Sequence, residues 1–204
     1  GASRLVSLMS CLALVGIAAN LTAHASSGAV ESYALGDWRA PFGIVLVLDR
    51  LSAMMLLLTS VLALAVMSYA VVTGADRKGW HFHPMFHFQL LGLNGAFLTG
   101  DLFNLFVFFE VLLIASYGLM LHGQGALRLK AGIAYVVINI AGSALFLIAL
   151  GLLYGLTSTL NMADLAVRVA NLPAEDQGLL RVAGLLLMAG FALKAAVVPI
   201  HLWM

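Results

Sequence analysis

The chain has 204 residues, of which 63% are hydrophobic and only 9% carry a charge. Soluble domains carry about 25% charged residues, so this composition excludes a soluble domain and indicates an integral membrane protein. The net charge of +1 and the scattered basic residues do not indicate nucleic-acid binding, and the single Cys11 excludes an internal disulfide or a cysteine-ligated cluster.

Six charge-poor apolar runs predict membrane helices. Nearly every face of each run is apolar, which is typical of membrane spans and not of amphipathic surface helices. We therefore expect an all-α polytopic membrane protein with about six transmembrane helices in a single transmembrane domain over residues 1–204. The expected helices cover residues 5–23, 51–73, 84–100, 101–121, 131–155 and 179–204, the last of them broken at Pro199.

The connections carry the polar residues. Residues 26–47 form a long connection with several aromatic side chains, which favours a short hairpin at the membrane interface. Residues 162–171 are consistent with a short amphipathic surface helix. The first run, preceded by Arg4, also resembles a signal peptide, but its length favours a true span.

Lysine and arginine set the expected orientation. Alternating spans place the short basic loops on one side, together with Arg4, and these short loops hold basic residues more densely than the longer ones. The positive-inside rule then assigns this side to the cytoplasm. The basic residues of these loops are Arg77, Lys78, Arg128 and Lys130.

Glu110 is the main candidate for function. It lies nine residues after Asp101 in an otherwise uncharged run, about 13 Å into a hydrocarbon layer of about 30 Å. An ionisable group there costs roughly 2.5–3.5 kcal/mol on insertion scales. Intramembrane carboxylates of this kind usually serve ion or proton movement.

Lys194 is the second expected buried charge. Pro199 has no amide proton for the carbonyl of Ala195, so it predicts a helix break close to the lysine. Broken helices at membrane depth line polar cavities, where a lysine can be hydrated. The alternative is a lysine that extends to the interface. His201 lies just beyond the break and is a possible proton relay.

Other polar residues have simpler interpretations. Asp101 follows Gly100 and is expected to cap the Glu110 helix, with a supporting role in the proton path as the alternative. His81, His83 and His87 could suggest a metal site, but they straddle Pro84 without a nearby carboxylate. We interpret them as loop histidines, and we expect no metal and no cofactor.

Three segments resemble one transporter family. NGAFLTGDLFNLFVFFEVLLIASY over residues 94–117 and PFGIVLVLDRLS over residues 41–52 are similar to the D-type subunit of the Mrp-type multisubunit Na+/H+ antiporters. KAAVVPIHLW over residues 194–203 resembles a segment shared with the antiporter-like subunits of respiratory complex I. The resemblance covers nearly all of the chain.

The resemblance implies a fourteen-helix subunit with two inverted five-helix repeats, of which this chain is an internal fragment holding the second to seventh helices. It also implies that Glu110 matches the key glutamate of the fifth helix and Lys194 the key lysine of the broken seventh. The implied partners are other antiporter subunits, H+, Na+ and the lipid bilayer, and the implied location is the bacterial inner membrane.

Three functions stay open at this point. The favoured one is a proton-translocating subunit of a Na+/H+ antiporter, a secondary transporter and not an enzyme. The second is an antiporter-like proton-pumping subunit of a NADH:quinone oxidoreductase or a membrane-bound hydrogenase. The third is a structural membrane scaffold, in which Glu110 and Lys194 have no role in transport.

Overall fold

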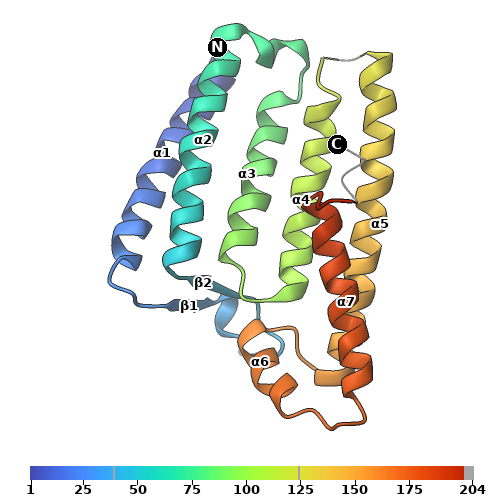
Figure 1. The fold of residues 1–204 in the computed structure, drawn as a ribbon. Coiled ribbons are helices and arrows are strands. Elements are labelled where there is room, and N and C mark those ends of the chain that lie inside the picture. The colour runs from blue at the N-terminus through green and yellow to red at the C-terminus, as the bar shows by residue number, and fades with distance from the viewer. Residues whose placement is uncertain (39, 124, 200–204) are drawn as a thin grey trace. The chain divides into compact units, whose positions relative to one another are not determined.

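Helices make up most of the chain in the computed structural model, which describes residues 1–38, 40–123 and 125–199 (Figure 1). Strands β1 and β2 pair in a two-stranded sheet within the long connection after the first helix. The elements are α1 (Ala2–Ala25), β1 (Glu31–Ala34), η1 (Leu35–Asp37), β2 (Val45–Leu48), α2 (Arg50–Thr73), η2 (Ala75–Lys78), α3 (Phe82–Leu98), α4 (Leu102–Met120), α5 (Ala126–Thr157), α6 (Met162–Ala170) and α7 (Gln177–Lys194).

Five of the described helices are long and apolar enough to cross a membrane, namely α1, α2, α4, α5 and α7. The expected polytopic helical fold is thereby confirmed. The one remaining expected span, residues 84–100, corresponds to α3, which has 17 residues. At 1.5 Å per residue it is about 25 Å long, somewhat shorter than the hydrocarbon layer of about 30 Å. The strand pair and α6 lie where a hairpin and a surface helix were expected.

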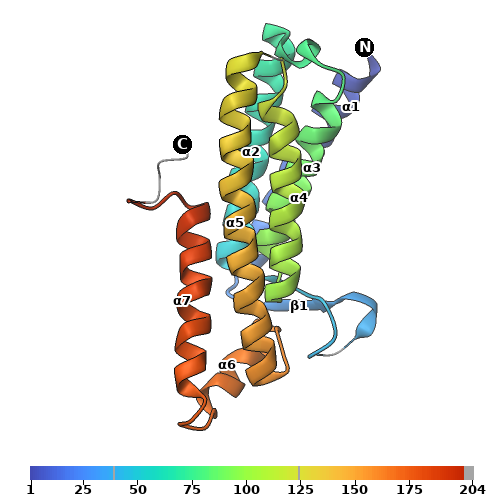
Figure 2. The same cartoon turned by 90° about the vertical axis from the view of Figure 1, so that its right-hand side faces the viewer.

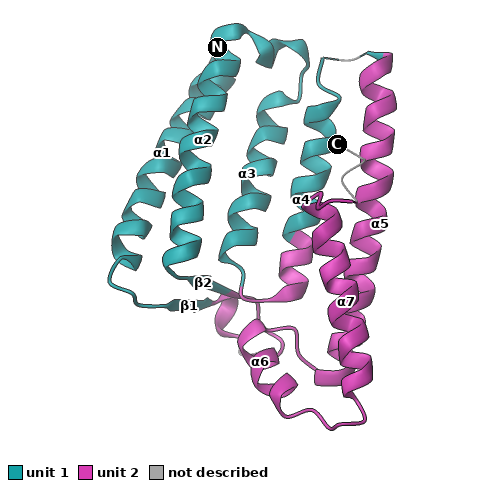
Figure 3. Cartoon of the chain, in the orientation of Figure 1, with its two compact units in different colours: residues 1–33, 46–99, 108–125 teal, residues 34–45, 100–107, 126–204 magenta. Residues whose placement is uncertain are grey.

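The chain divides into two compact units (Figure 3). Unit 1 comprises residues 1–33, 46–99 and 108–125, and unit 2 comprises residues 34–45, 100–107 and 126–204. Helix α4 contributes its first residues to unit 2 and the rest to unit 1. We describe each unit by itself, and the single transmembrane domain expected from the sequence stays a prediction.

In unit 1, α1 lies alongside α2 and also contacts α3. Their shared core includes Cys11, Met67, Phe86 and Leu90, all less than 9% exposed. Local signals set the start and end of α2. Asp49 accepts a hydrogen bond from the Ser52 amide at 2.7 Å, and the Ser52 hydroxyl accepts one from the Asp49 amide at 2.8 Å. This capping box starts the helix, and Gly74 in the left-handed conformation ends it.

Glycines allow α3 and α4 to approach closely. A Cβ atom added to Gly92 would lie 2.5 Å from the Leu112 Cβ and 2.8 Å from the Phe108 carbonyl oxygen. A Cβ on Gly95 would lie 2.2 Å from the Phe108 ring. Contacts this short do not occur between real atoms, so this interface requires glycine at both positions. The close approach fixes which face of α4 lies against α3.

In unit 2, α5 and α7 lie side by side in both views (Figures 1 and 2). The Phe146 side chain of α5 is fully buried and contacts the Phe191 ring of α7 edge-on at 5.1 Å. Gly142 faces Leu193, and Gly190 faces both Gly142 and Phe146. The small residues of α5 therefore form a packing face for α7, as expected for helices that associate in a membrane.

Two helices, α5 and α7, differ most from their expected bounds. Helix α7 ends at Lys194, whereas the sequence predicted a helix to residue 204 with a break at Pro199. The chain leaves the helical conformation at Ala196, with φ of 51°. Proline disfavours the helical conformation of the residue before it, so a helix commonly ends upstream of a proline. Helix α5 has 32 residues and extends beyond the expected 131–155 at both ends. Its first turns carry Arg128 and Lys130, which water can solvate.

We expect Gly92→Ala to destabilise the protein, because the new methyl group would force α3 away from Leu112 and the Phe108 carbonyl. Overpacking of this kind costs about 1–3 kcal/mol. The measurement is the melting temperature of the purified full-length protein in detergent. Gly155→Ala is the control, since a Cβ there meets nothing within 4 Å. Equal melting temperatures for the two variants would contradict the close α3–α4 contact.

Candidate functional site

Glu110 is the only charged residue of α4 and the ninth of its 19 residues. It is half-buried. Phe108 and Leu112 face α3, and Glu110 lies two residues from each. Two residues correspond to a rotation of about 200° around the helix, so the carboxylate lies on the face opposite α3.

The face of α4 that carries Glu110 is otherwise apolar and exposed. Three apolar residues lie in one row with Glu110 along the helix. They are Phe103 and Val107, seven and three residues before it, and Ile114, four residues after it. Their exposed fractions are 50%, 39% and 63%. A carboxylate within such a stripe is costly to keep in lipid, and the functional role expected for Glu110 stays a prediction.

Asp101 caps α4, as the sequence predicted. Its carboxylate accepts a hydrogen bond from the Asn104 amide at 2.8 Å, and its side chain is buried. A relay role for Asp101 stays a prediction.

Main-chain hydrogen bonds hold the entry to α4 on two sides. The Gly100 amide donates to the Val45 carbonyl at 2.7 Å, and the Gly100 carbonyl accepts from the Met162 amide at 2.9 Å. The Leu102 amide donates to the Leu160 carbonyl at 2.9 Å. We call these three bonds the main-chain clasp. The clasp connects the start of the Glu110 helix to β2 and to the start of α6.

Lys194 is the last residue of α7 and is half-buried. Its Nζ atom donates a hydrogen bond to the Ser143 hydroxyl at 3.0 Å. Ser143 is 7% exposed and lies at the centre of the charge-free part of α5, residues 131–155. The ammonium group therefore lies beside this central residue of α5, and its burial within the membrane stays a prediction.

The expected pair is divided between the two units. Glu110 belongs to unit 1 and Lys194 to unit 2, so their proximity stays a prediction. Pro199 follows the end of α7, and His201 lies outside the described residues. Within the described part of the chain, no group of three histidine, cysteine or acidic residues is arranged to hold a metal ion.

A buried charge cluster at one end of unit 1 was missed by sequence reasoning. The Asp76 side chain is 3% exposed and accepts two hydrogen bonds from the Arg4 guanidinium group, one of them at 2.6 Å. The His83 Nε2 atom lies 3.3 Å from the same carboxylate, and its Nδ1 atom lies 2.9 Å from the Ser7 hydroxyl. The cluster joins α1, η2 and α3. No sequence signal pairs Arg4 with Asp76, because 72 residues separate them.

Arg4 controls the charge of Asp76. The hydrogen bonds from Arg4 hold the pKa of Asp76 below its ordinary value and outweigh desolvation, which acts in the opposite direction. Asp76 is therefore ionised throughout the physiological pH range. Its pairing with Arg4 accounts for a carboxylate buried at this position.

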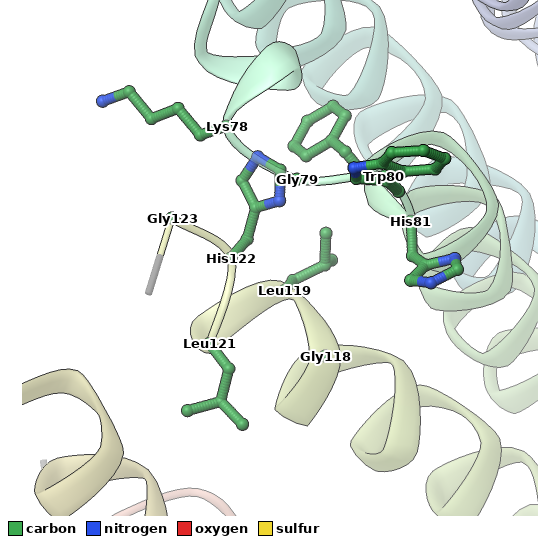
Figure 4. A pocket seen from close by; sticks show the side chains of 10 residues that line it. Lys78, Gly79, Trp80, His81, Gly118, Leu119, Leu121, His122 and Gly123 are labelled. Atoms are coloured by element: carbon green, nitrogen blue, oxygen red, sulfur yellow. The ribbon is translucent and has the colours of Figure 1, made fainter. Parts of the chain in front are cut away.

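Basic and aromatic residues surround a pocket at the same end of unit 1, between the start of α3 and the end of α4 (Figure 4). Its volume is about 250 Å³, and its lining includes Lys78, Trp80, His81 and His122. The His122 Nε2 atom lies 2.8 Å from the carbonyl oxygen of Ala75. This contact orients the imidazole ring over Gly79. It joins the segment that follows α4 to the segment that precedes α3.

Residues 99–204 match a family model described as "NADH:quinone oxidoreductase/Mrp antiporter, TM". This match covers more than half of the chain and includes both α4 and α7. The chain belongs to this NADH:quinone oxidoreductase/Mrp antiporter family.

Relatives of this antiporter-family chain carry antiporter names. It is 52% identical over its whole length to a protein of Rhizobium meliloti named as the D-type subunit of a probable K(+)/H(+) antiporter, and covers 37% of that protein. It is 47% identical to the D-type subunit of a Na(+)/H(+) antiporter of Alkalihalophilus pseudofirmus, with 83% of this chain and 34% of the relative aligned. The chain thus spans about a third of the length of these relatives.

The fold is similar to that of a solved antiporter complex. A chain of the Mrp complex from Dietzia sp. DQ12-45-1b superposes with a TM-score of 0.87 and 35% identity, covering 99% of this chain and 38% of that one. The five apolar helices and the bacterial relatives identify this family member as a multi-pass bacterial membrane protein. The relatives are named as subunits, which indicates that such chains work within multisubunit membrane complexes.

We expect Asp76→Asn to lower the melting temperature of the full-length protein, because Arg4 would lose its ionised partner. A carboxylate with a depressed pKa stabilises the fold above its ordinary pKa, and this contribution is lost as the pH falls through the folded-state pKa. The difference in melting temperature between wild type and variant should therefore stay constant from about pH 8 to 5. It should become smaller below about pH 4. Asp37→Asn, at an exposed turn, is the control. Equal melting temperatures of wild type and Asp76→Asn at neutral pH would contradict the ion pair of Arg4 and Asp76.

Proposed function

We propose that the chain is part of a proton-translocating membrane subunit of a multisubunit monovalent cation (Na+)/H+ antiporter. The observation that carries this proposal is the single carboxylate of α4, Glu110, at mid-depth in an apolar helix of a chain from this family. In this role the protein is a secondary transporter subunit and not an enzyme. Its partners are the other antiporter subunits, and its surroundings are the lipid of the bacterial plasma membrane.

Glu110 and Lys194 act together in the proposed mechanism. At about 4 Å, a carboxylate and an ammonium group attract each other by about 4 kcal/mol at an effective dielectric constant of 20. An apolar environment instead favours the protonated, neutral carboxyl group. Glu110 therefore releases its proton when a positive charge approaches and binds one when that charge withdraws.

Ser143 provides a resting position for the lysine in this mechanism. The hydroxyl group accepts a hydrogen bond from the Lys194 Nζ atom but carries no charge to compete with a carboxylate. Lys194 can therefore exchange between the neutral Ser143 partner and the charged Glu110 partner. Helix α7 ends at Lys194, and the chain continues in a turn in which the Ala196 amide donates to the Leu193 carbonyl at 3.2 Å.

The transported cation is proposed to be Na+. One relative is named for Na+ and another for K+, so the cation is decided by measuring both. His201 and Asp101 are proposed as supporting residues of the proton path, His201 as a relay and Asp101 through its cap on the Glu110 helix. No resident cofactor or metal is part of the proposal.

Glu110→Gln in the full antiporter complex should abolish cation-dependent proton movement, because the amide has nearly the same shape but cannot release a proton. The measurement is the recovery of a pH-sensitive dye signal in inverted membrane vesicles after addition of Na+ or K+. Glu175→Gln, in an exposed loop, is the matched control and should retain transport. Normal transport by an assembled complex carrying Glu110→Gln would exclude the proposed role.

A second candidate is a proton-pumping subunit of a redox complex, such as a NADH:quinone oxidoreductase or a membrane-bound hydrogenase. The description of the matched family, which names NADH:quinone oxidoreductase beside the antiporter, favours this possibility. Both functions use the same buried charges. They differ in the source of energy.

Purification of the native complex distinguishes the two candidates. An antiporter should catalyse no quinone-dependent NADH oxidation, while reconstituted vesicles should exchange protons for Na+ or K+ without any electron donor. NADH oxidation that drives proton uptake into the vesicles would replace the antiporter proposal by the redox one. A preparation of membranes lacking the complex gives the background rate.

A further inference from the structure

Three polar residues of α3 lie on one face of the helix. His83, His87 and Asn94 are separated by four and seven residues, which places them in one row along the helix axis. Gly92 and Gly95, which contact α4, lie on the other side. The polar row faces α1, because the Ser7 hydroxyl of α1 lies 2.9 Å from His83 and other residues of α1 line the same space as His87 and Asn94.

The polar row extends from the start of the helix past its middle. His83 is the second residue of α3, and Asn94 is the thirteenth. At 1.5 Å per residue, Asn94 lies about 18 Å from the start of the helix. The three polar residues therefore span about 17 Å of one helix face, with Leu90 between His87 and Asn94.

A half-open cavity of about 210 Å³ lies between α1 and α3 along this row. Ser10, Cys11 and Leu14 of α1 line it on one side, and His87 and Asn94 with two leucines of α3 line it on the other. Each water of liquid occupies about 30 Å³, so this space accommodates several water molecules.

Two polar atoms in the row have no protein partner. The Nε2 atom of His87 and the Oδ1 atom of Asn94 are buried and make no hydrogen bond within the described part of the chain. Buried polar atoms are almost always hydrogen-bonded to protein or to water. A roomy cavity beside two unsatisfied polar atoms is the arrangement in which ordered water is expected.

We propose that the space between α1 and α3 is a hydrated proton path, with the cluster of Arg4, Asp76 and His83 at its entrance and His87 as its intramembrane carrier. A proton from cavity water adds to a ring nitrogen of neutral His87 to give the imidazolium. Release of one N–H proton to the next water restores the neutral ring, so the passage leaves no net change. The titratable groups that face the carrier are His83, one helical turn away, and Cys11.

Asp76 sets the charge at the entrance of the proposed path. Its carboxylate is ionised and paired with Arg4, so the entrance is close to electrically neutral and does not accumulate anions or metal cations. His83 contacts the same carboxylate and can bind a proton there. The carrier role of His87 rests on the proposed proton transport, whereas hydration of the cavity can be tested without it.

Hydration is tested by cysteine accessibility in the full complex, in a Cys11→Ala background. His87→Cys and Phe88→Cys place a thiol at neighbouring depths, the first in the cavity and the second on the exposed surface of α3, where Phe88 is 51% exposed. The probe is a charged, membrane-impermeant methanethiosulfonate. Thiolates form in water and not in lipid, so His87→Cys should react at least about tenfold faster than Phe88→Cys. Equal rates would overturn the proposed hydration.

The carrier role is tested by His87→Gln in the otherwise unchanged complex. Glutamine keeps hydrogen-bonding capacity but cannot carry a proton, so cation-dependent proton movement should fall about tenfold or more. His81→Gln, an exposed histidine of the preceding loop, should leave it unchanged. Normal transport by the His87→Gln complex would overturn the carrier role. That result would leave the proposed function intact, because the function is decided by Glu110→Gln.

Discussion

The structure depends on one constraint, which is that a polar group inside an apolar helix bundle has to find its partner within the protein or in bound water. The Lys194 ammonium group meets it with the hydroxyl of Ser143. Asp76 meets it with a guanidinium group, and the Asn139 side chain donates to the Tyr135 carbonyl one turn earlier at 2.9 Å. The partners of Lys194 and Asp76 come from other elements that pack against them, whereas the partner of Asn139 lies in its own helix.

Small residues make these partnerships possible. Gly142 and Gly190 bring α5 and α7 close enough for a lysine on one helix to reach a serine on the other. Gly92 and Gly95 do the same for α3 and α4, and they determine that Glu110 points away from α3. In a membrane, where burial of apolar surface gives no driving force between helices, such close contacts provide much of the attraction through van der Waals packing.

The sequence predicts features that depend on neighbouring residues. The isolated charges of Glu110 and Lys194, the Asp101 cap and the apolar helices all follow from local patterns. The end of α7 was predicted too far along the chain, because the helix ends at Lys194 and the backbone of Ala196 is in the left-handed region, upstream of Pro199. The contacts of Lys194 with Ser143 and of Arg4 with Asp76 span 51 and 72 residues, and no local pattern encodes them. His83 was interpreted as a loop histidine, although it lies in α3 and contacts the carboxylate of Asp76, which is paired with Arg4.

The main-chain clasp around Gly100 has a consequence for the evolution of the protein. Its three hydrogen bonds join only peptide groups, so they do not depend on the identity of the side chains at Val45, Leu160 or Met162. Substitutions at these three positions can therefore accumulate while the base of the Glu110 helix keeps its position.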